Sequence, residues 1–420
     1  MEQKKVLVVG INPWIDNTGI NTLINFFDGW GADAVAHIYT RDKLPNTRVC
    51  SNFFQISETK VVKSVVFRKL KTGRRVYNTP AEAPQTEHAI YRKPAGAGKQ
   101  LLREMIWKLG KWKTKELDAF LEEFAPDVLF FPVYSNVYMC RLQNYIAGKL
   151  KKPVVLYSSD DNYSYTAVRH TPLSLLHRFW LRHQEKKLFK RASKVLVISP
   201  KQKEEYDRLF HTDCGVLTKG IDYSQVNYEP KPLGEPVRMV YTGKLIIGRW
   251  KSLAEIAQAL GQINRDSTKM VLDIYTTDTL TQEQKTALNR NGCSVRGALR
   301  LDQVQQVQKE ADVLVFVESL EKKFRYTARL SFSTKITDYL KSGKCIFAVG
   351  DSQIAPMDYF ARFDSAVTAI SYDQIGEKLR MLAEDPSLIE QYGRKAFECG
   401  KMNHDKLKMQ KKLHDAIMEA

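Results

Sequence analysis

The segment from Ser333 to Gly343 holds residues whose types and spacing suit the binding of a diphosphate. Ser333 suits a helix N-cap and Gly343 the left-handed position after a last turn, so the segment predicts a short helix. Its first turn, with Thr334 and Lys335, would offer unpaired backbone N–H groups, the positive end of the helix dipole and a full positive charge. Asp338 falls on the same helical face as Lys335, where its carboxylate suits hydrogen bonds from ribose hydroxyls. The alternative interpretation is a solvent-facing Lys–Asp pair on a capped helix.

Apolar, β-branched segments recur along both halves of the chain and predict the strands that must position this helix. Since both faces of such segments are hydrophobic, they are typical of buried parallel strands. They lie at 6–9, 128–131, 154–157, 195–198, 239–241, 271–274, 313–316 and 345–349. Helical stretches such as 114–124 and 175–191 separate them, and this alternation predicts α/β domains with doubly wound sheets.

We expect two domains, because 420 residues exceed what one ordinary core holds. The proline-rich segment 230–236 separates two series of strands. We therefore assign residues 1–228 to an N-terminal domain and residues 229–400 to a C-terminal domain. Residues 401–420 are rich in helix formers, and we expect a helix that packs back on the N-terminal domain.

The composition favours a soluble protein with an anionic partner. Hydrophobic residues make up 43% and charged residues 27%, which excludes general disorder, and the formal net charge is +18. This charge favours nucleic acid, an anionic lipid surface or phosphorylated small molecules. The six cysteines lack the spacing of a zinc site or a disulfide framework, and the apolar run at 6–9 is too short for a signal peptide or a membrane span. We therefore expect a cytoplasmic location.

Several short motifs, taken together, resemble glycosyltransferase family 4, a family with the GT-B fold. The segment 333–344 is similar to the family's phosphate-binding element P-S-K-x-x-E-Y-x-x-x-G-K-P. Other pieces follow in the family's order: the glycine loop at Gly10 and Gly19, the strand entry at 124–131, the A-D-x-V-I-x-V-S strand at 192–200, the N-G-V-D turn at 219–222, the x-V-G-R-L segment at 241–245 and the glycine after a strand at Gly297. The resemblance covers most of the chain.

The resemblance implies roles for individual residues. It makes Lys244, in place of the usual Arg, and either Arg249 or Lys251 the cations that contact the diphosphate; the spacing does not decide between the last two. In retaining members such cations, rather than a divalent metal, stabilise the leaving diphosphate, so we expect electrostatic catalysis without a metal or another cofactor. The further residues expected at the nucleotide are Gly19, Arg296, Gly297, Thr334, Lys335 and Asp338. The alternative is that the three cations are ordinary surface residues.

The chain departs from the family pattern at two places. Leu330 stands where the family often has Glu, so the donor-sugar contacts are expected to differ or to come from the loop at 325–329. The family's frequent His after the third N-terminal strand is missing, and the segment 158–161 occupies that region. Asp160 or Asp161 is a candidate to orient the acceptor hydroxyl or to meet the developing sugar charge, with loop capping as an equal alternative.

The densest basic region runs from 60 to 115. Within it the stretch 101–112 predicts a helix with one apolar stripe, formed by Leu102, Met105, Ile106 and Leu109. Such a helix can lie on an anionic membrane surface, although the stripe more often packs into a core. The segment 96–100 resembles a Walker A loop but lacks its first glycine and its hydroxyl residue, so we expect a flexible basic loop.

The expected architecture is GT-B: two Rossmann-like domains with doubly wound parallel sheets, facing across a cleft, with the acceptor bound by the first and the nucleotide by the second. The expected activity is transfer of a hexosyl group from a nucleoside diphosphate-sugar to a glycan or lipid-linked glycan, as in bacterial polysaccharide biosynthesis, with retention implied by the resemblance. A peripheral position on the inner face of the membrane is a further expectation. The alternatives are a nucleotide-sugar epimerase or a sugar-phosphate synthase on the same fold, or a non-catalytic protein that binds an anionic surface; no nucleic-acid partner is expected.

Overall fold

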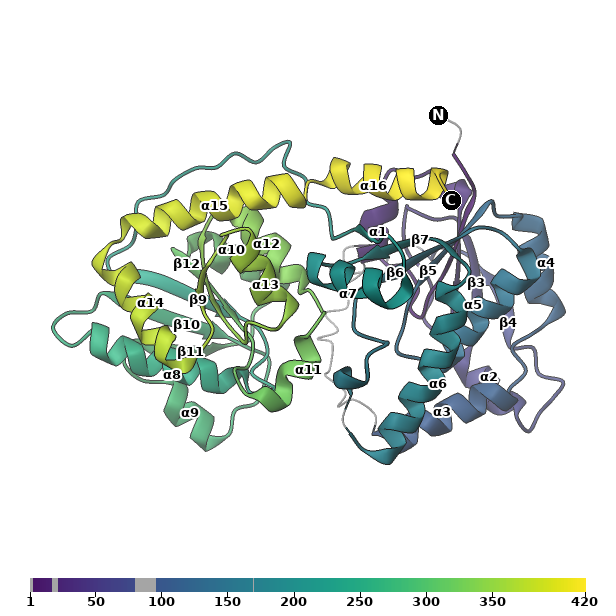
Figure 1. Ribbon diagram of the computed structural model, residues 1–420, viewed down its shortest axis with the longest axis horizontal. Coiled ribbons are helices and arrows are strands. Elements are labelled where there is room, and N and C mark those ends of the chain that lie inside the picture. Colours follow the sequence, from purple (N-terminus) through teal and green to yellow (C-terminus); the bar gives the residue numbers. More distant parts are fainter. Residues whose placement is uncertain (1–2, 17–21, 80–95, 169) are drawn as a thin grey trace. The chain divides into compact units, whose positions relative to one another are not determined.

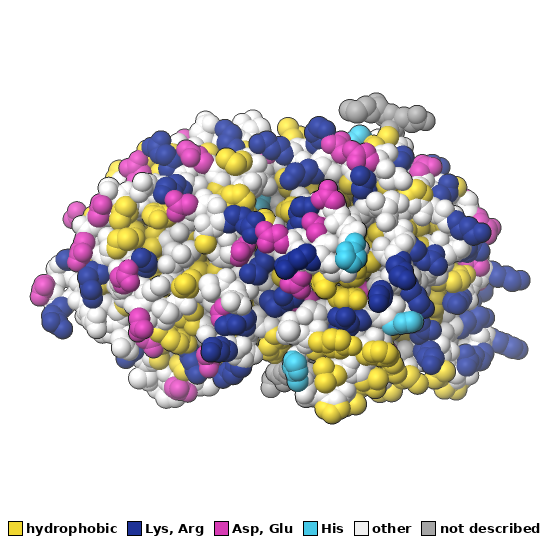
Figure 2. Space-filling view, viewed as in Figure 1, with side chains coloured by type: hydrophobic (Ala, Val, Ile, Leu, Met, Phe, Trp, Pro, Cys, Tyr) yellow, Lys and Arg dark blue, Asp and Glu magenta, His cyan; other side chains and the backbone are white. Residues whose placement is uncertain are grey.

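The computed structural model describes residues 3–16, 22–79, 96–168 and 170–420. The chain divides into two compact units (Figure 1). The N-terminal unit comprises Met1–Ile198, Gln202–Thr218 and Met409–Ala420, and the C-terminal unit comprises Ser199–Lys201 and Lys219–Lys408. The main division therefore follows Thr218, earlier in the chain than the boundary at 228 that the proline-rich segment suggested. Lys and Arg side chains lie on the surface of both units, as Figure 2 shows for one face.

The N-terminal unit is built on one eight-stranded sheet. Its strands are β1 (Val6–Val9), β2 (Val35–Tyr39), β3 (Asn52–Ile56), β4 (Gly73–Val76), β5 (Val128–Pro132), β6 (Val154–Ser158), β7 (Ala192–Val197) and β8 (Gly215–Val216). Their spatial order is β4-β3-β2-β1-β5-β6-β7-β8, and all neighbours are parallel except β4, which runs antiparallel to β3. The sequence predicted β1, β5, β6 and β7 and missed the other four.

Helices pack on both faces of this sheet (Figure 1). They are α1 (Thr22–Phe27), α2 (Glu58–Ser64), α3 (Ala97–Leu109), α4 (Lys115–Phe124), α5 (Val137–Leu150), α6 (Pro172–Phe189), α7 (Pro200–Phe210) and α16 (Lys406–Met418), with the 3-10 turns Ala32–Ala34 and Tyr165–Ala167. Successive residues of β1 point to opposite faces, so Leu7 packs with residues of α4, α5 and α6, whereas Val8 packs with residues of α1 and α16. This two-sided burial explains why β1 is apolar throughout.

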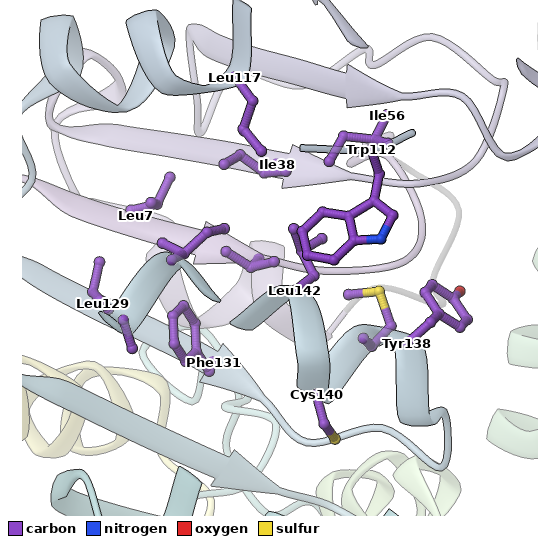
Figure 3. Packing of buried hydrophobic residues seen from close by; sticks show 14 of the residues in the cluster. Leu7, Ile38, Ile56, Trp112, Leu117, Leu129, Phe131, Tyr138, Cys140 and Leu142 are labelled. Carbon is purple, nitrogen blue, oxygen red and sulfur yellow. The ribbon is translucent and has the colours of Figure 1, made fainter. Parts of the chain in front are cut away.

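Aromatic and aliphatic side chains fill the core on the α4–α6 face. Figure 3 shows the indole of Trp112 among Ile56, Leu142 and Tyr138, with Leu7 and Phe131 from the central strands. On the other face α16 buries Met409, Leu413, Ala416 and Ile417 against the sheet. The last residues of the chain are thus part of the N-terminal unit.

The C-terminal unit has a six-stranded, fully parallel sheet in the order β11-β10-β9-β12-β13-β14. The strands are β9 (Val237–Thr242), β10 (Met270–Tyr275), β11 (Cys293–Gly297), β12 (Val313–Val317), β13 (Cys345–Val349) and β14 (Val367–Ala369). The helices are α8 (Arg249–Ile263), α9 (Gln282–Leu288), α10 (Leu301–Glu310), α11 (Arg325–Ala328), α12 (Thr334–Ser342), α13 (Ala355–Arg362), α14 (Tyr372–Glu384) and α15 (Ser387–Asn403), with the 3-10 turn Lys322–Phe324. Of the strands, β11 and β14 were not predicted.

Both sheets reverse their winding direction beside their first strand. In the C-terminal unit the chain winds outward from β9 to β10 and β11, then returns to place β12 on the other side of β9. The carboxyl ends of β9 and β12 therefore border a topological switch point, the place where open parallel sheets bind their ligands.

The structure corrects two local predictions of secondary structure. The segment 96–100, expected as a flexible loop, contributes Ala97–Gln100 to the first turn of α3, and the expected loop at 325–329 contains the short helix α11. The predicted helix ends at Ser333 and Gly343 are confirmed: the Ser333 side chain accepts a hydrogen bond from the Lys335 backbone N–H, and Gly343 has a φ of 64°. Among the described residues, no helix is long and apolar enough to cross a membrane.

Candidate anion-binding site

Three cationic residues gather at the switch point of the C-terminal sheet. Lys244 follows β9, Arg249 begins α8, and Lys335 lies in the first turn of α12. The positive charges of Arg249 and Lys244 both act on Lys335. The N-termini of two helices, α8 and α12, thus contribute residues to a region of concentrated positive charge.

The ammonium group of Lys335 is held against the backbone at the end of β9. Its Nζ donates a hydrogen bond of 2.7 Å to the carbonyl oxygen of Thr242 and lies 6.0 Å from the centre of the Tyr241 ring. A Cβ on Gly243 would lie 2.6 Å from this nitrogen, so a larger residue there would displace the ammonium group from this position. The residue as a whole is solvent-exposed, but its nitrogen is enclosed; this desolvation, followed by repulsion from Arg249, lowers the pKa of Lys335 to about 8.

Arg249 is paired with a carboxylate that the sequence analysis did not identify. Its Nε and Nη2 donate to Glu318 over 3.0 and 2.7 Å, a two-point contact that fixes the plane of the guanidinium. Burial opposes the charged form of Arg249, but the ion pair with Glu318 outweighs it and raises the pKa of Arg249. Glu318 immediately follows β12, so its place after a buried strand was the signal that could have identified it.

The turn before Arg249 brings α8 close to the end of β12. Gly248 has a φ of 74°, and a Cβ there would lie 2.5 Å from the Ser319 hydroxyl oxygen. This position therefore needs glycine for both its backbone conformation and its surroundings. The close approach brings the start of α8 next to Glu318 and Ser319.

The structure distinguishes the two residues that the spacing left open. Lys251, in the first turn of α8, donates to Glu321 over 3.1 Å, and Lys323 contacts the same carboxylate over 3.0 Å. Arg249, by contrast, is close enough to Lys335 to lower its pKa. The geometry therefore groups Arg249, rather than Lys251, with Lys244 and Lys335.

Two further predicted residues flank the start of α12. Thr334 is exposed in the first turn. Asp338 is also exposed and accepts a hydrogen bond of 2.9 Å from Lys219, which belongs to the turn that resembles N-G-V-D. Asp338 thus lies on the same helix as Lys335, with its carboxylate held by a second cation.

Arg296 and Gly297 are contributed by β11, at the edge of the sheet. Arg296 donates to Asp273 over 2.7 Å, a carboxylate that Arg238 also contacts over 3.0 Å. Gly297 has a φ of 91°, and a Cβ added there would meet nothing within 4 Å, so its backbone conformation alone requires glycine. None of these contacts reaches Lys335 or Arg249, so the structure does not bring Arg296 together with the central cations.

The remaining candidates belong to the N-terminal unit. Asp161 is buried and accepts a 2.9 Å hydrogen bond from the backbone N–H of Ser164, a contact that supports the loop-capping interpretation for this residue. Asp160 is exposed and accepts from the Ser159 hydroxyl over 3.3 Å. Gly19 lies outside the described residues. Over the described part of the chain, no three His, Cys, Asp or Glu side chains form a group suited to hold a metal ion.

The fold, unlike the sequence, has clear counterparts among known proteins. No protein-family model and no curated protein matches the sequence. The solved structure of HepE from Anabaena, in complex with UDP, is similar with a TM-score of 0.63 and 11% identity, over 99% of this chain and 100% of that chain. Sucrose-phosphate synthase from Thermosynechococcus elongatus has a TM-score of 0.61 and 12% identity over 98% of both chains. WaaG, a glycosyltransferase involved in lipopolysaccharide biosynthesis, has a TM-score of 0.57 and 14% identity, over 99% of this chain and 100% of that chain. These similarities span both units, and with the two parallel-dominated sheets they show that the chain has the GT-B fold.

Proposed function

We propose that this protein is a glycosyltransferase that takes a sugar from a nucleoside diphosphate-sugar and binds the diphosphate at the carboxyl ends of β9 and β12. The observation that carries the proposal is the meeting of Lys335, Arg249 and Lys244 at the switch point of the C-terminal sheet. A diphosphate there would meet fixed cations and the N-terminal end of α12 without rearrangement of the backbone.

The proposed chemistry depends on stabilising the leaving group. When the bond from the sugar to the β-phosphate breaks, negative charge grows on the diphosphate, and cations already in place stabilise it. Arg249 is held in orientation by Glu318, and Lys335 by the Thr242 carbonyl and the space left by Gly243. We propose that these side chains do the electrostatic work without a divalent ion.

The finer assignments are part of the same proposal. Because HepE is solved with UDP and with UDP-glucose, we propose a uridine nucleotide and a hexosyl group. The motifs that resemble family 4 support retention of configuration and a glycan or lipid-linked glycan acceptor, with the N-terminal unit and the exposed Asp160 on the acceptor side. Asp338 is the proposed partner of the ribose. We place the enzyme in the cytoplasm, peripherally attached to the membrane.

Calorimetric titration with UDP, GDP, ADP and CMP tests this proposal. One diphosphate is expected to bind selectively, and Lys335→Ala to weaken it about tenfold to a hundredfold, since a charge-assisted hydrogen bond contributes about 1.5–3 kcal/mol. Lys341→Ala, which removes the same side chain from the last turn of the same helix, is the matched control and should bind like the parent. If the parent bound none of the nucleotides, or both variants bound like the parent, the site and the function would be refuted.

A further inference from the structure

Three neighbouring segments of the N-terminal unit expose large apolar side chains to solvent. Helix α3 packs against both α2 and α6. The exposed side chains, which we call the apolar ridge, are Val66 and Phe67 after α2, Leu102, Met105 and Leu109 on α3, and Leu173, Leu176 and Phe179 on α6. Phe67, Leu102 and Phe179 are 67%, 62% and 59% exposed, so more than half of each meets water. Figure 2 shows hydrophobic side chains gathered over the area where Figure 1 labels α3 and α6.

The outward direction of the α3 leucines is fixed by a polar anchor on the opposite face of the helix. Glu104 is 3% exposed, and its carboxylate accepts hydrogen bonds from the backbone N–H groups of Val137 and Tyr138 over 2.9 and 2.7 Å. These N–H groups belong to the first two residues of α5, and the side chain of its N-cap residue forms no capping hydrogen bond. The Glu104 carboxylate therefore caps the N-terminus of α5 and interacts favourably with the positive end of its dipole. Since Glu104 faces inward, Leu102, two residues earlier and so on the other side of the helix, must face solvent.

The segment after α2 is tied to the end of α3. Arg68 donates from Nη1 to the carbonyl oxygen of Leu109 over 2.9 Å, and Lys111 donates to the carbonyl oxygen of Arg68 over 3.4 Å. These bonds place Val66 and Phe67 beside the C-terminal end of the helix. The ridge is therefore continuous from α2 through α3 to α6.

Lys and Arg predominate among the charged side chains around the ridge. Within the described stretches 60–79 and 96–115, the only carboxylate is the buried Glu104. The exposed cations there are Lys63, Arg68, Lys69, Lys71, Arg74, Arg75, Lys99, Lys108, Lys111, Lys113 and Lys115. Two of them form ion pairs with carboxylates just outside these stretches, Lys71 with Glu116 and Arg75 with Glu123. A partner that covers the ridge must thus offer both apolar material and negative charge.

We propose that the apolar ridge docks the protein on an anionic lipid surface, with its side chains in the boundary between headgroups and acyl chains and its lysines facing the headgroups. Interfacial helices bind by this combination of apolar burial and attraction to anionic lipid. A second copy of this chain would bring the same positive charge against the ridge and is disfavoured by repulsion. The proposal specifies the surface for the peripheral attachment proposed above, but it does not rest on the proposed catalytic activity, because the ridge contains none of the residues of the candidate anion-binding site.

Vesicle co-sedimentation of the full chain tests the proposal. The parent should bind vesicles of phosphatidylcholine with phosphatidylglycerol and leave pure phosphatidylcholine vesicles unbound, with binding that weakens as salt rises. Leu102→Glu with Leu109→Glu should lower the partition coefficient at least about tenfold. The matched control is Met402→Glu with Leu407→Glu, which adds the same charge at side chains that are 64% and 73% exposed in the C-terminal unit, and it should retain most of the binding. Lys63→Ala and Lys108→Ala should each lower binding about fivefold.

Three results would overturn the proposal: equal binding to neutral and anionic vesicles, equal loss in the ridge and control variants, or no binding by the parent. A parent that is dimeric by light scattering, and that the ridge substitutions make monomeric without any vesicle binding, would assign the ridge to a second copy instead. Thermal melts confirm that the variants fold. UDP titration of the ridge variant should match the parent, so a failure here is distinct from a failure of the proposed function.

Discussion

Diphosphate binding is expected to weaken at alkaline pH because Lys335 loses its proton. Burial of its nitrogen and repulsion from Arg249 lower the pKa of Lys335 to about 8. The protonated form binds the diphosphate, and a bound diphosphate in turn stabilises that form. The Lys335 contribution to affinity is therefore present below pH 8 and is lost as pH rises above it.

The size of the effect follows from this pKa. If UDP binds only the protonated form of Lys335, the dissociation constant is proportional to one plus the ratio of neutral to protonated Lys335. With a pKa of about 8, the dissociation constant should rise about 25-fold between about pH 7.5 and 9.5. The neighbouring tyrosines and Arg249 do not titrate in this window. Burial raises the pKa of Tyr339 to about 12 and also raises that of Tyr241, while the ion pair with Glu318 keeps Arg249 charged.

Calorimetry with UDP across this range measures the effect, with Lys335→Met as the matched variant. The variant should bind weakly and with a nearly constant dissociation constant, so it also corrects for any titration of the nucleotide or of distant groups. In the parent, binding near pH 8 should take up a proton, which appears as a dependence of the binding enthalpy on the buffer. A flat profile in the parent, or the same fall in both proteins, would refute the assignment of Lys335 to the diphosphate.

Four further outcomes are expected. Gly243→Ala places a Cβ 2.6 Å from the Lys335 nitrogen and 2.9 Å from the hydroxyl oxygen of the buried Tyr241, so both UDP affinity and the free energy of unfolding, measured by urea titration, should fall. Asp338→Ala should weaken uridine and UDP alike in calorimetry, whereas Lys335→Ala should leave uridine binding nearly unchanged. Turnover should persist in EDTA; a loss that manganese or magnesium restores would contradict metal-free catalysis. Burial raises the pKa of Glu185, whose oxygens have no hydrogen-bond partner, to about 8. The folded state thus holds a proton that the unfolded chain releases near pH 4.5, so the free energy of unfolding falls as pH rises from 4.5 to 8. Glu185→Gln removes this titration. Relative to the parent, its free energy of unfolding should rise by about 1.4 kcal/mol for each pH unit in that window, as measured by urea titration.

The buried parallel strands could be predicted from sequence because both of their faces are covered, so β1 and β12 are apolar at every position. Edge strands such as β4 could not, because two of its four residues face solvent and its pairing with β3 is a long-range contact. The caps of α12 were predicted correctly, since Ser333 and Gly343 act locally.

The partners of the site cations could not be predicted in the same way. Glu318 meets Arg249 only because the sheet order brings the ends of β9 and β12 together, and no spacing in the chain encodes that contact. The apolar stripe of α3 was identified, but its direction depends on the anchoring of Glu104 at the start of α5. A helix period defines a face without saying which side is the core.

The antiparallel edge strand β4 has a consequence for how the protein behaves at high concentration. A sheet edge presents unpaired backbone groups to which another chain can add a strand, and such addition leads to aggregation. On β4 the two solvent-facing residues are Arg74 and Arg75, and Arg75 forms an ion pair with Glu123. The opposite edge, β8, has only two residues. Both edges of the N-terminal sheet are therefore poor templates for strand addition, one because of its charge and the other because of its length.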